Sequence, residues 1–134
     1  MTGKERLTDA IRVILRENKR ILFAYLYGSF VGNDVYRDID IGIYVSSSDE
    51  NPFAICSDLK TRISRLAQSL GVMVSADQVD VRVINDAPFM FLKRIFKEGI
   101  LLKDTDPDLR TDMIERVSMK YRECAGLLAE ASLR

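Results

Sequence analysis

Histidine is absent from this 134-residue chain, and neither sign of charge is in excess. Without an imidazole, the chain cannot use Ser-His-Asp or Cys-His catalysis, histidine-ligated zinc or histidine acid-base chemistry. Lysine plus arginine and aspartate plus glutamate each number 20, so the formal net charge is zero. This balance gives no electrostatic basis for general binding to nucleic acid or to a membrane surface.

Cysteine is scarce, and long apolar runs are missing. Cys56 and Cys124 fit no metal-binding spacing, and each lies on the apolar stripe of an expected helix, so we interpret both as reduced core residues. No apolar run reaches membrane-spanning length, and the N-terminus does not resemble a signal peptide. We therefore expect a cytoplasmic protein without membrane contacts. The length predicts one domain over residues 1–134.

The hydrophobic periodicity predicts an α+β fold in which a small mixed sheet is packed with helices. Helices are predicted over about 4–18, 52–70 and 88–98, and a long final helix from about 107. Strands are predicted over 21–27, 38–45 and 79–84, the first two as a hairpin. The final helix carries an apolar stripe from Leu109 to Leu128, longer than the sheet needs, so its end could meet another chain.

Two aspartates stand in the otherwise apolar second strand. Strand alternation places Asp38 and Asp40 on one face, about 6–7 Å apart, where a divalent cation would remove their repulsion. Oxygen-only ligands favour a hard ion such as Mg²⁺, or Mn²⁺ in its place. Asp80 has the equivalent setting in a later strand. If that strand lies beside the strand of Asp38 and Asp40, three carboxylates converge, and such a set can hold two metals for phosphoryl transfer. A lone Asp-x-Asp motif more often lies on the solvated face of an edge strand.

Gly28 and Ser29 follow the first strand and suit phosphate binding. A glycine lets the backbone approach a phosphate closely, and a serine adds a hydroxyl and an amide donor. Alone, the pair would be an ordinary turn. Together with the aspartates it predicts a site for a nucleoside triphosphate. Arg82 shares the outward face with Asp80, and a structural ion pair and a substrate contact are both open for it.

Three elements in this order, Gly28-Ser29, Asp38-Ile39-Asp40 and Asp80 within VDVRVINDAP, resemble the signature of the DNA polymerase β-like nucleotidyltransferases. The resemblance is strongest to the minimal nucleotidyltransferases, the MntA-type (MNT) antitoxins, and covers roughly residues 21–104. Two features depart from that pattern. Only eight residues separate Ser29 from Asp38, a shorter loop than is usual there, and SFVGND lacks the arginine that commonly follows Gly-Ser.

The resemblance implies a polymerase β-like fold and metal-dependent transfer of a nucleotide, AMP from ATP, to a hydroxyl. Asp38 and Asp40 would hold the metal that binds the triphosphate, and Asp80 would help to hold a second. Gly28 and Ser29 would bind the leaving phosphates. The acceptor implied is a tyrosine of a partner HEPN-domain toxin.

Two alternatives remain: a small-molecule transferase of the aminoglycoside-modifying kind, and a non-catalytic partner-binding module with a relic site. The sequence also leaves open whether the donor is ATP or another nucleoside triphosphate. It leaves open the oligomeric state as well, and a homo-oligomer is possible.

Overall fold

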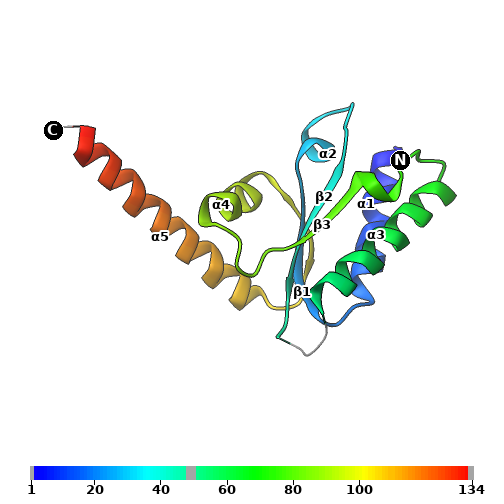
Figure 1. Ribbon diagram of the computed structural model, residues 1–134, viewed down its shortest axis with the longest axis horizontal. Coiled ribbons are helices and arrows are strands. Elements are labelled where there is room, and N and C mark those ends of the chain that lie inside the picture. The colour runs from blue at the N-terminus through cyan, green and yellow to red at the C-terminus, as the bar shows by residue number, and fades with distance from the viewer. Residues whose placement is uncertain (1, 48–50, 133–134) are drawn as a thin grey trace.

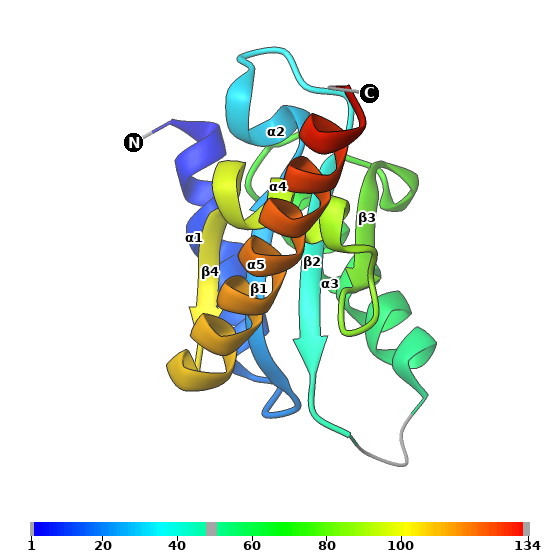
Figure 2. The ribbon, with the colours of Figure 1, turned by 90° about the vertical axis from the view of Figure 1, so that its left-hand side faces the viewer.

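A computed structural model describes residues 2–47 and 51–132 of the chain. A four-stranded mixed sheet lies between two helical layers, with α1 and α3 on one face and α4 and α5 on the other (Figures 1 and 2). The helices are α1 (Gly3–Arg16), α2 (Ser29–Gly32), α3 (Pro52–Ser69), α4 (Phe89–Glu98) and α5 (Pro107–Ser132), with a 3₁₀ turn η1 (Ala76–Gln78). The strands are β1 (Ile21–Tyr27), β2 (Ile39–Val45), β3 (Val79–Val83) and β4 (Ile100–Asp104). The α+β prediction is confirmed.

The sheet has the order β3-β2-β1-β4. β1 runs antiparallel to both β2 and β4, whereas β2 and β3 are parallel and are joined through α3. The strands that carry Asp40 and Asp80 are therefore neighbours, which is the condition on which the three carboxylates could converge, and the two residues are register partners.

Strand alternation divides the apolar side chains between two cores. On the face covered by α1 and α3, the buried strand residues include Ala24, Leu26, Ile39, Ile41, Ile43, Val79 and Val81. On the opposite face, Phe23 and Tyr25 pack with residues of α4 and α5, chiefly Leu92, Ile95, Met113 and Val117. Side chains alternate along a strand, so Asp40 and Asp80 point to the face opposite Ile39, Ile41, Val79 and Val81. They therefore lie on the side of the sheet that carries α4, outside the larger core.

Several helix ends follow signals visible in the sequence. Asn51 accepts a hydrogen bond from Phe53 N at 2.9 Å, with Pro52 in the first turn of α3. Asp106 caps α5 by accepting from Leu109 N at 3.1 Å. Gly71, with φ of +75°, follows the last turn of α3, as expected for a glycine stop.

The structure corrects the predicted elements in three places. β2 begins at Ile39, so Asp38 precedes the strand instead of opening it. The β1–β2 connection contains a helical turn, α2, and residues 100–104 form a fourth strand that was not predicted. The strand was not recognised from the sequence because the charged Lys103 interrupts its apolar run. Lys103 is buried because its Nζ donates to the carbonyl oxygens of Leu15 (2.9 Å) and Asn18 (2.7 Å) at the end of α1.

The first half of α5 packs on α4 and on the face of the sheet that α4 covers, and its second half projects away from the body of the molecule (Figure 1). Met113 and Val117 are buried, whereas Leu127 and Leu128 are 65% and 73% exposed. The predicted apolar stripe therefore belongs to the core only in its first half. In the described part of the chain, no helix combines the length and apolar character needed to cross a bilayer.

Candidate functional site

The predicted acidic residues meet at one end of the sheet. Asp40 in β2 lies opposite Tyr27 of β1 on one side and opposite Asp80 of β3 on the other. Asp38 is two residues before Asp40, just ahead of the strand. The parallel pairing of β2 with β3 thus brings together carboxylates that are about 40 residues apart in sequence.

The charges at this end of the sheet influence one another. Burial raises the pKa of Asp40 above its ordinary value, and the negative charges of Asp80 and Asp38 raise it further. Asp80 is engaged by a cation of the protein itself, because its Oδ2 accepts a hydrogen bond from Arg82 Nε at 2.8 Å. Among the residues that the structure describes, no three acidic, histidine or cysteine side chains are grouped closely enough to hold a metal ion.

Gly28 holds the backbone against the carboxylate of Asp40. Its φ of +79° and ψ of −157° lie in a region that is essentially restricted to glycine. A Cβ at this position would overlap Oδ2 of Asp40. The predicted role of this glycine, a close approach of the backbone to the site, therefore has a geometric counterpart beside Asp40.

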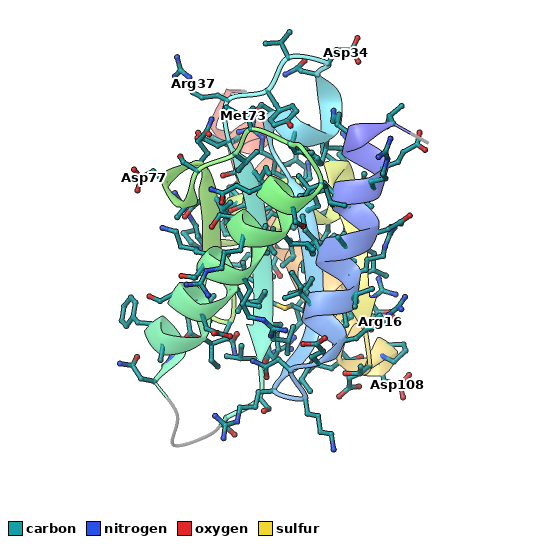
Figure 3. All side chains as sticks on the ribbon, turned by 90° about the vertical axis from the view of Figure 1, so that its right-hand side faces the viewer. Arg16, Asp34, Arg37, Met73, Asp77 and Asp108 are labelled. Carbon is teal, nitrogen blue, oxygen red and sulfur yellow. The ribbon has the colours of Figure 1, made fainter. Side chains whose placement is uncertain are left out.

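Ser29 ties the connection after β1 to the start of β2. Its Oγ lies 3.5 Å from the carbonyl oxygen of Asp38 and accepts a hydrogen bond from Arg37 N at 3.4 Å. Arg37 itself points outward at the end of the molecule that carries Asp34, away from Arg16 and Asp108 at the opposite end (Figure 3). The Gly-Ser pair thus adjoins both aspartates of the Asp-x-Asp motif.

A cavity of about 500 Å³ opens beside these residues. A hollow of similar volume lies at the other end of β2, around Tyr44 and Asn85, so the chemistry of the lining and not its size singles out the first. Neither Asp38 nor Asp80 lines the cavity. It is bounded by Tyr27, Gly28, Ser29, Asn33 and Asp40, and on α4 by Phe91, Arg94, Ile95 and Glu98.

Tyr27 is the one buried polar group of this cavity without a partner among the described residues. Its hydroxyl is shielded from solvent and makes no hydrogen bond there. Burial, and then the charge of Asp40, raise the pKa of Tyr27 to about 12, so the phenol stays protonated and can donate. The Phe91 ring meets it edge-on, with centroids 5.6 Å apart. From the sequence alone, packing is a more common role for such a strand tyrosine than a contact with a nucleotide base, so no pattern singled it out.

The residues contributed by α4 were not selected from the sequence. Phe91, Arg94, Ile95 and Glu98 follow the i, i+3, i+4, i+7 pattern of one helix face. That pattern identifies a face, but only the packing of α4 over the sheet makes it a wall of the cavity.

The donor atoms at this end of the sheet are of the chemical kind that a hard divalent cation prefers. Asp38, Asp40 and Asp80 offer carboxylate oxygens, and the chain has no histidine to offer nitrogen. Mg²⁺ and Mn²⁺ prefer such oxygen ligands. The unpartnered hydroxyl of Tyr27 leaves a polar group at the cavity that a bound phosphate or water could satisfy.

Residues 9–108, which cover all four strands, match the family model described as polymerase beta, nucleotidyltransferase. The chain belongs to the polymerase beta nucleotidyltransferase family. The predicted nucleotidyltransferase activity class and the predicted fold are thereby confirmed. A search of curated protein sequences gave no significant match.

Solved structures of similar fold include complexes of MntA-type antitoxins, as the sequence resemblance indicated. An MNT antitoxin in complex with the tri-AMPylated HEPN toxin of Shewanella oneidensis is 20% identical, with a TM-score of 0.62 over 96% of both chains. A MntA–HepT toxin–antitoxin structure is 16% identical, with a TM-score of 0.61 over 97% of this chain and 99% of the other. A toxin–antitoxin structure with AMP-PNP is 19% identical, with a TM-score of 0.61 over 94% and 98%. At these identities the likeness establishes the fold.

Proposed function

We propose that this nucleotidyltransferase transfers AMP from ATP, with Mg²⁺ or Mn²⁺, to a tyrosine hydroxyl of a HEPN-type partner protein. The observation that carries the proposal is the register of β2 with β3. It sets Asp40 beside Asp80, two residues after Asp38, next to a glycine whose backbone alone fits against the Asp40 carboxylate. Carboxylates from neighbouring strands are the kind of ligand that metal-assisted transfer of a nucleotidyl group uses.

Asp38 and Asp40 would hold the cation that accompanies the triphosphate, and Asp80 would share a second cation with them. Bound there, divalent cations neutralise the phosphate charge and lower the pKa of the acceptor hydroxyl. Gly28 and Ser29 would contact the leaving phosphates. The hydroxyl oxygen would form a bond to the α-phosphorus while the bond to the β-phosphate oxygen breaks, releasing pyrophosphate and a proton. Tyr27 would donate its otherwise unpaired hydroxyl hydrogen into the cavity.

Two features support a protein acceptor. The cavity of about 500 Å³ is bounded by Tyr27, the β1–β2 connection, Asp40 and one face of the ten-residue helix α4, and a bulky second substrate would approach it from outside. The second half of α5 projects from the body and exposes Leu127 and Leu128, an apolar end suited to contact with another chain. The tri-AMPylated HEPN toxin seen with the S. oneidensis antitoxin supports a partner of this kind as the acceptor, and the choice of a tyrosine follows the resemblance stated from the sequence.

The proposal is tested by purifying the protein together with the product of its neighbouring gene and incubating the complex with labelled ATP and Mg²⁺. Intact-mass analysis should show one or more AMP additions on the partner. The additions should be absent when the protein carries Asp38→Asn or when a chelator replaces the metal. Label on the partner that persists in Asp38→Asn would contradict the assigned site.

The alternatives give different results in the same experiment. Adenylylation of an added aminoglycoside, with no complex and no mass added to the partner, would establish the small-molecule transferase. A stable complex without transfer under any metal or nucleoside triphosphate would establish the non-catalytic module. Replacing ATP by the other nucleoside triphosphates measures the choice of donor.

A further inference from the structure

Arg82 forms a hydrogen-bonded ion pair with Asp80, the carboxylate that is proposed to help hold the second cation. It stands two residues after Asp80 on the same face of β3, and its Nε donates to Asp80 Oδ2 at 2.8 Å. Its register partner on β2 is Gly42, which places no side chain on that face between Arg82 and its neighbours. The local sequence Asp-x-Arg on a strand is therefore sufficient to bring the guanidinium back over the aspartate.

The surroundings of Arg82 favour its positive charge. The hydrogen bond that Arg82 donates to Asp80 and the negative charge of Asp80 raise the pKa of Arg82 further above its ordinary value, and Asp40 contributes in the same direction. On its other side the guanidinium carbon lies 5.9 Å from the centre of the Phe91 ring. The guanidinium is thus a cation held within the acidic end of the sheet by an anion on one side and an aromatic ring on the other.

The pair is accessible and can be broken. The side chains of Arg82 and Asp80 are 60% and 39% exposed. Ion pairs of this exposure change an equilibrium by a factor of about 1.4 to 5. The guanidinium occupies one of the roughly four lone-pair sites of the Asp80 carboxylate, and its positive charge repels a divalent cation that approaches the same oxygen.

We propose that Arg82 occupies the place of a cation at Asp80 in the metal-free protein and is displaced when a divalent cation binds. Arg82 is then a positioning residue that lowers the affinity of the site for free metal and offsets the negative charge of Asp80 until metal arrives. This inference rests on the proposed role of Asp80 as a metal ligand.

The test is a titration of the nucleotide-free full chain with Mn²⁺, following the signal of unbound Mn²⁺ by electron paramagnetic resonance. Arg82→Gln removes the charge and the Nε donor, and it should tighten Mn²⁺ binding about two- to fivefold, the strength of the pair that is lost. Arg82→Lys keeps a positive donor and should restore most of the weaker binding. The ratio between Arg82→Gln and the unmodified protein should shrink at high salt, because salt screens the exposed pair.

Two matched controls separate a broken pair from a general change in charge. Arg94 lines the neighbouring cavity with Asp40 but pairs with Glu98 at 3.6 Å, so Arg94→Gln changes the local field without freeing an aspartate. Arg12 forms a comparable exposed pair with Asp9 at 3.1 Å on α1, which lies on the opposite face of the sheet. Arg12→Gln should leave Mn²⁺ binding unchanged, and Arg94→Gln should change it less than Arg82→Gln.

The outcomes distinguish this inference from the proposed function. If Asp80→Asn weakens Mn²⁺ binding but Arg82→Gln leaves it unchanged or weaker, displacement of Arg82 is wrong and the metal role of Asp80 stands. An equal effect of Arg82→Gln and Arg94→Gln also overturns displacement, because it assigns the effect to the field alone. If neither the unmodified protein nor Arg82→Gln binds Mn²⁺ through Asp80, the proposed metal site fails and this inference fails with it.

Discussion

Replacement of Gly28 by alanine should damage stability and the site together. Its backbone has φ of +79° and ψ of −157°, a conformation that costs a residue with a Cβ about 1–3 kcal/mol. For a chain of this length that loss lowers the melting temperature by about 3–15 °C. In addition, the new Cβ would overlap Oδ2 of Asp40, so the carboxylate must move away from its present position.

The displacement of Asp40 should reduce transfer much more than the loss of stability does. A catalytic group misplaced by about 1 Å can cost roughly 100-fold in rate. The assay is AMP transfer to the co-purified partner at a temperature where circular dichroism shows the Gly28→Ala protein to be folded. Under those conditions we expect transfer to fall by about 100-fold.

Gly71→Ala is the matched control. Gly71 also has a positive φ, +75°, but a Cβ there would meet no atom within 4 Å, and the residue follows the end of α3. We expect a stability loss of about 1 kcal/mol with transfer unchanged. If the Gly28→Ala and Gly71→Ala proteins have the same melting temperature and the same rate of transfer, the close approach of Gly28 to Asp40 has no role in transfer.

Three further predictions follow from the same geometry. Burial, Asp80 and Asp38 raise the pKa of Asp40, so the ionised carboxylate destabilises the folded protein. Asp40→Asn should therefore abolish transfer but raise the melting temperature at neutral pH. This gain in melting temperature should vanish as the pH falls below the ordinary pKa of 3.8, where the carboxyl is protonated in both the folded and the unfolded states. A melting temperature that falls at neutral pH would contradict this account. ATP with Mg²⁺ should raise the melting temperature more than either alone, since each completes the site of the other, and an equal rise with ATP in chelator would exclude the metal role. Leu127→Glu with Leu128→Glu should weaken binding to the partner, measured by calorimetry, without lowering the melting temperature, because both side chains are exposed; undiminished binding would place the interface elsewhere.

The sequence alone determined most of the local structure. The alternation of Ile39, Ile41 and Ile43 with polar or small residues predicted a strand with one buried face, and the structure buries all three. Capping residues and glycines marked the starts and ends of helices because their side chains and backbone angles act within a few residues. The order of Gly28-Ser29, Asp38, Asp40 and Asp80 was enough to indicate the family, because the family signature is defined by the order of its residues along the chain.

Contacts between distant segments were decided only by tertiary structure. The strand at 100–104 escaped prediction because Lys103 is buried by carbonyl groups of α1 that lie more than 80 residues away. The pairing of Asp40 with Asp80 depends on β2 and β3 being parallel, and no local pattern states which strands will be neighbours. The placement of α4 over the sheet turned Phe91 and Arg94 into walls of a cavity.

The side-chain partners within the site show the same division. The sequence placed Asp80 and Arg82 on one face, because strand side chains alternate, but left open whether the arginine would pair or face a substrate. The folded chain pairs them at 2.8 Å, since Asp40, Asp80 and Phe91 together surround that position with negative charge and an aromatic face. Local periodicity therefore determined which residues could meet, and the packing of strands and helices from distant parts of the chain determined which of them did.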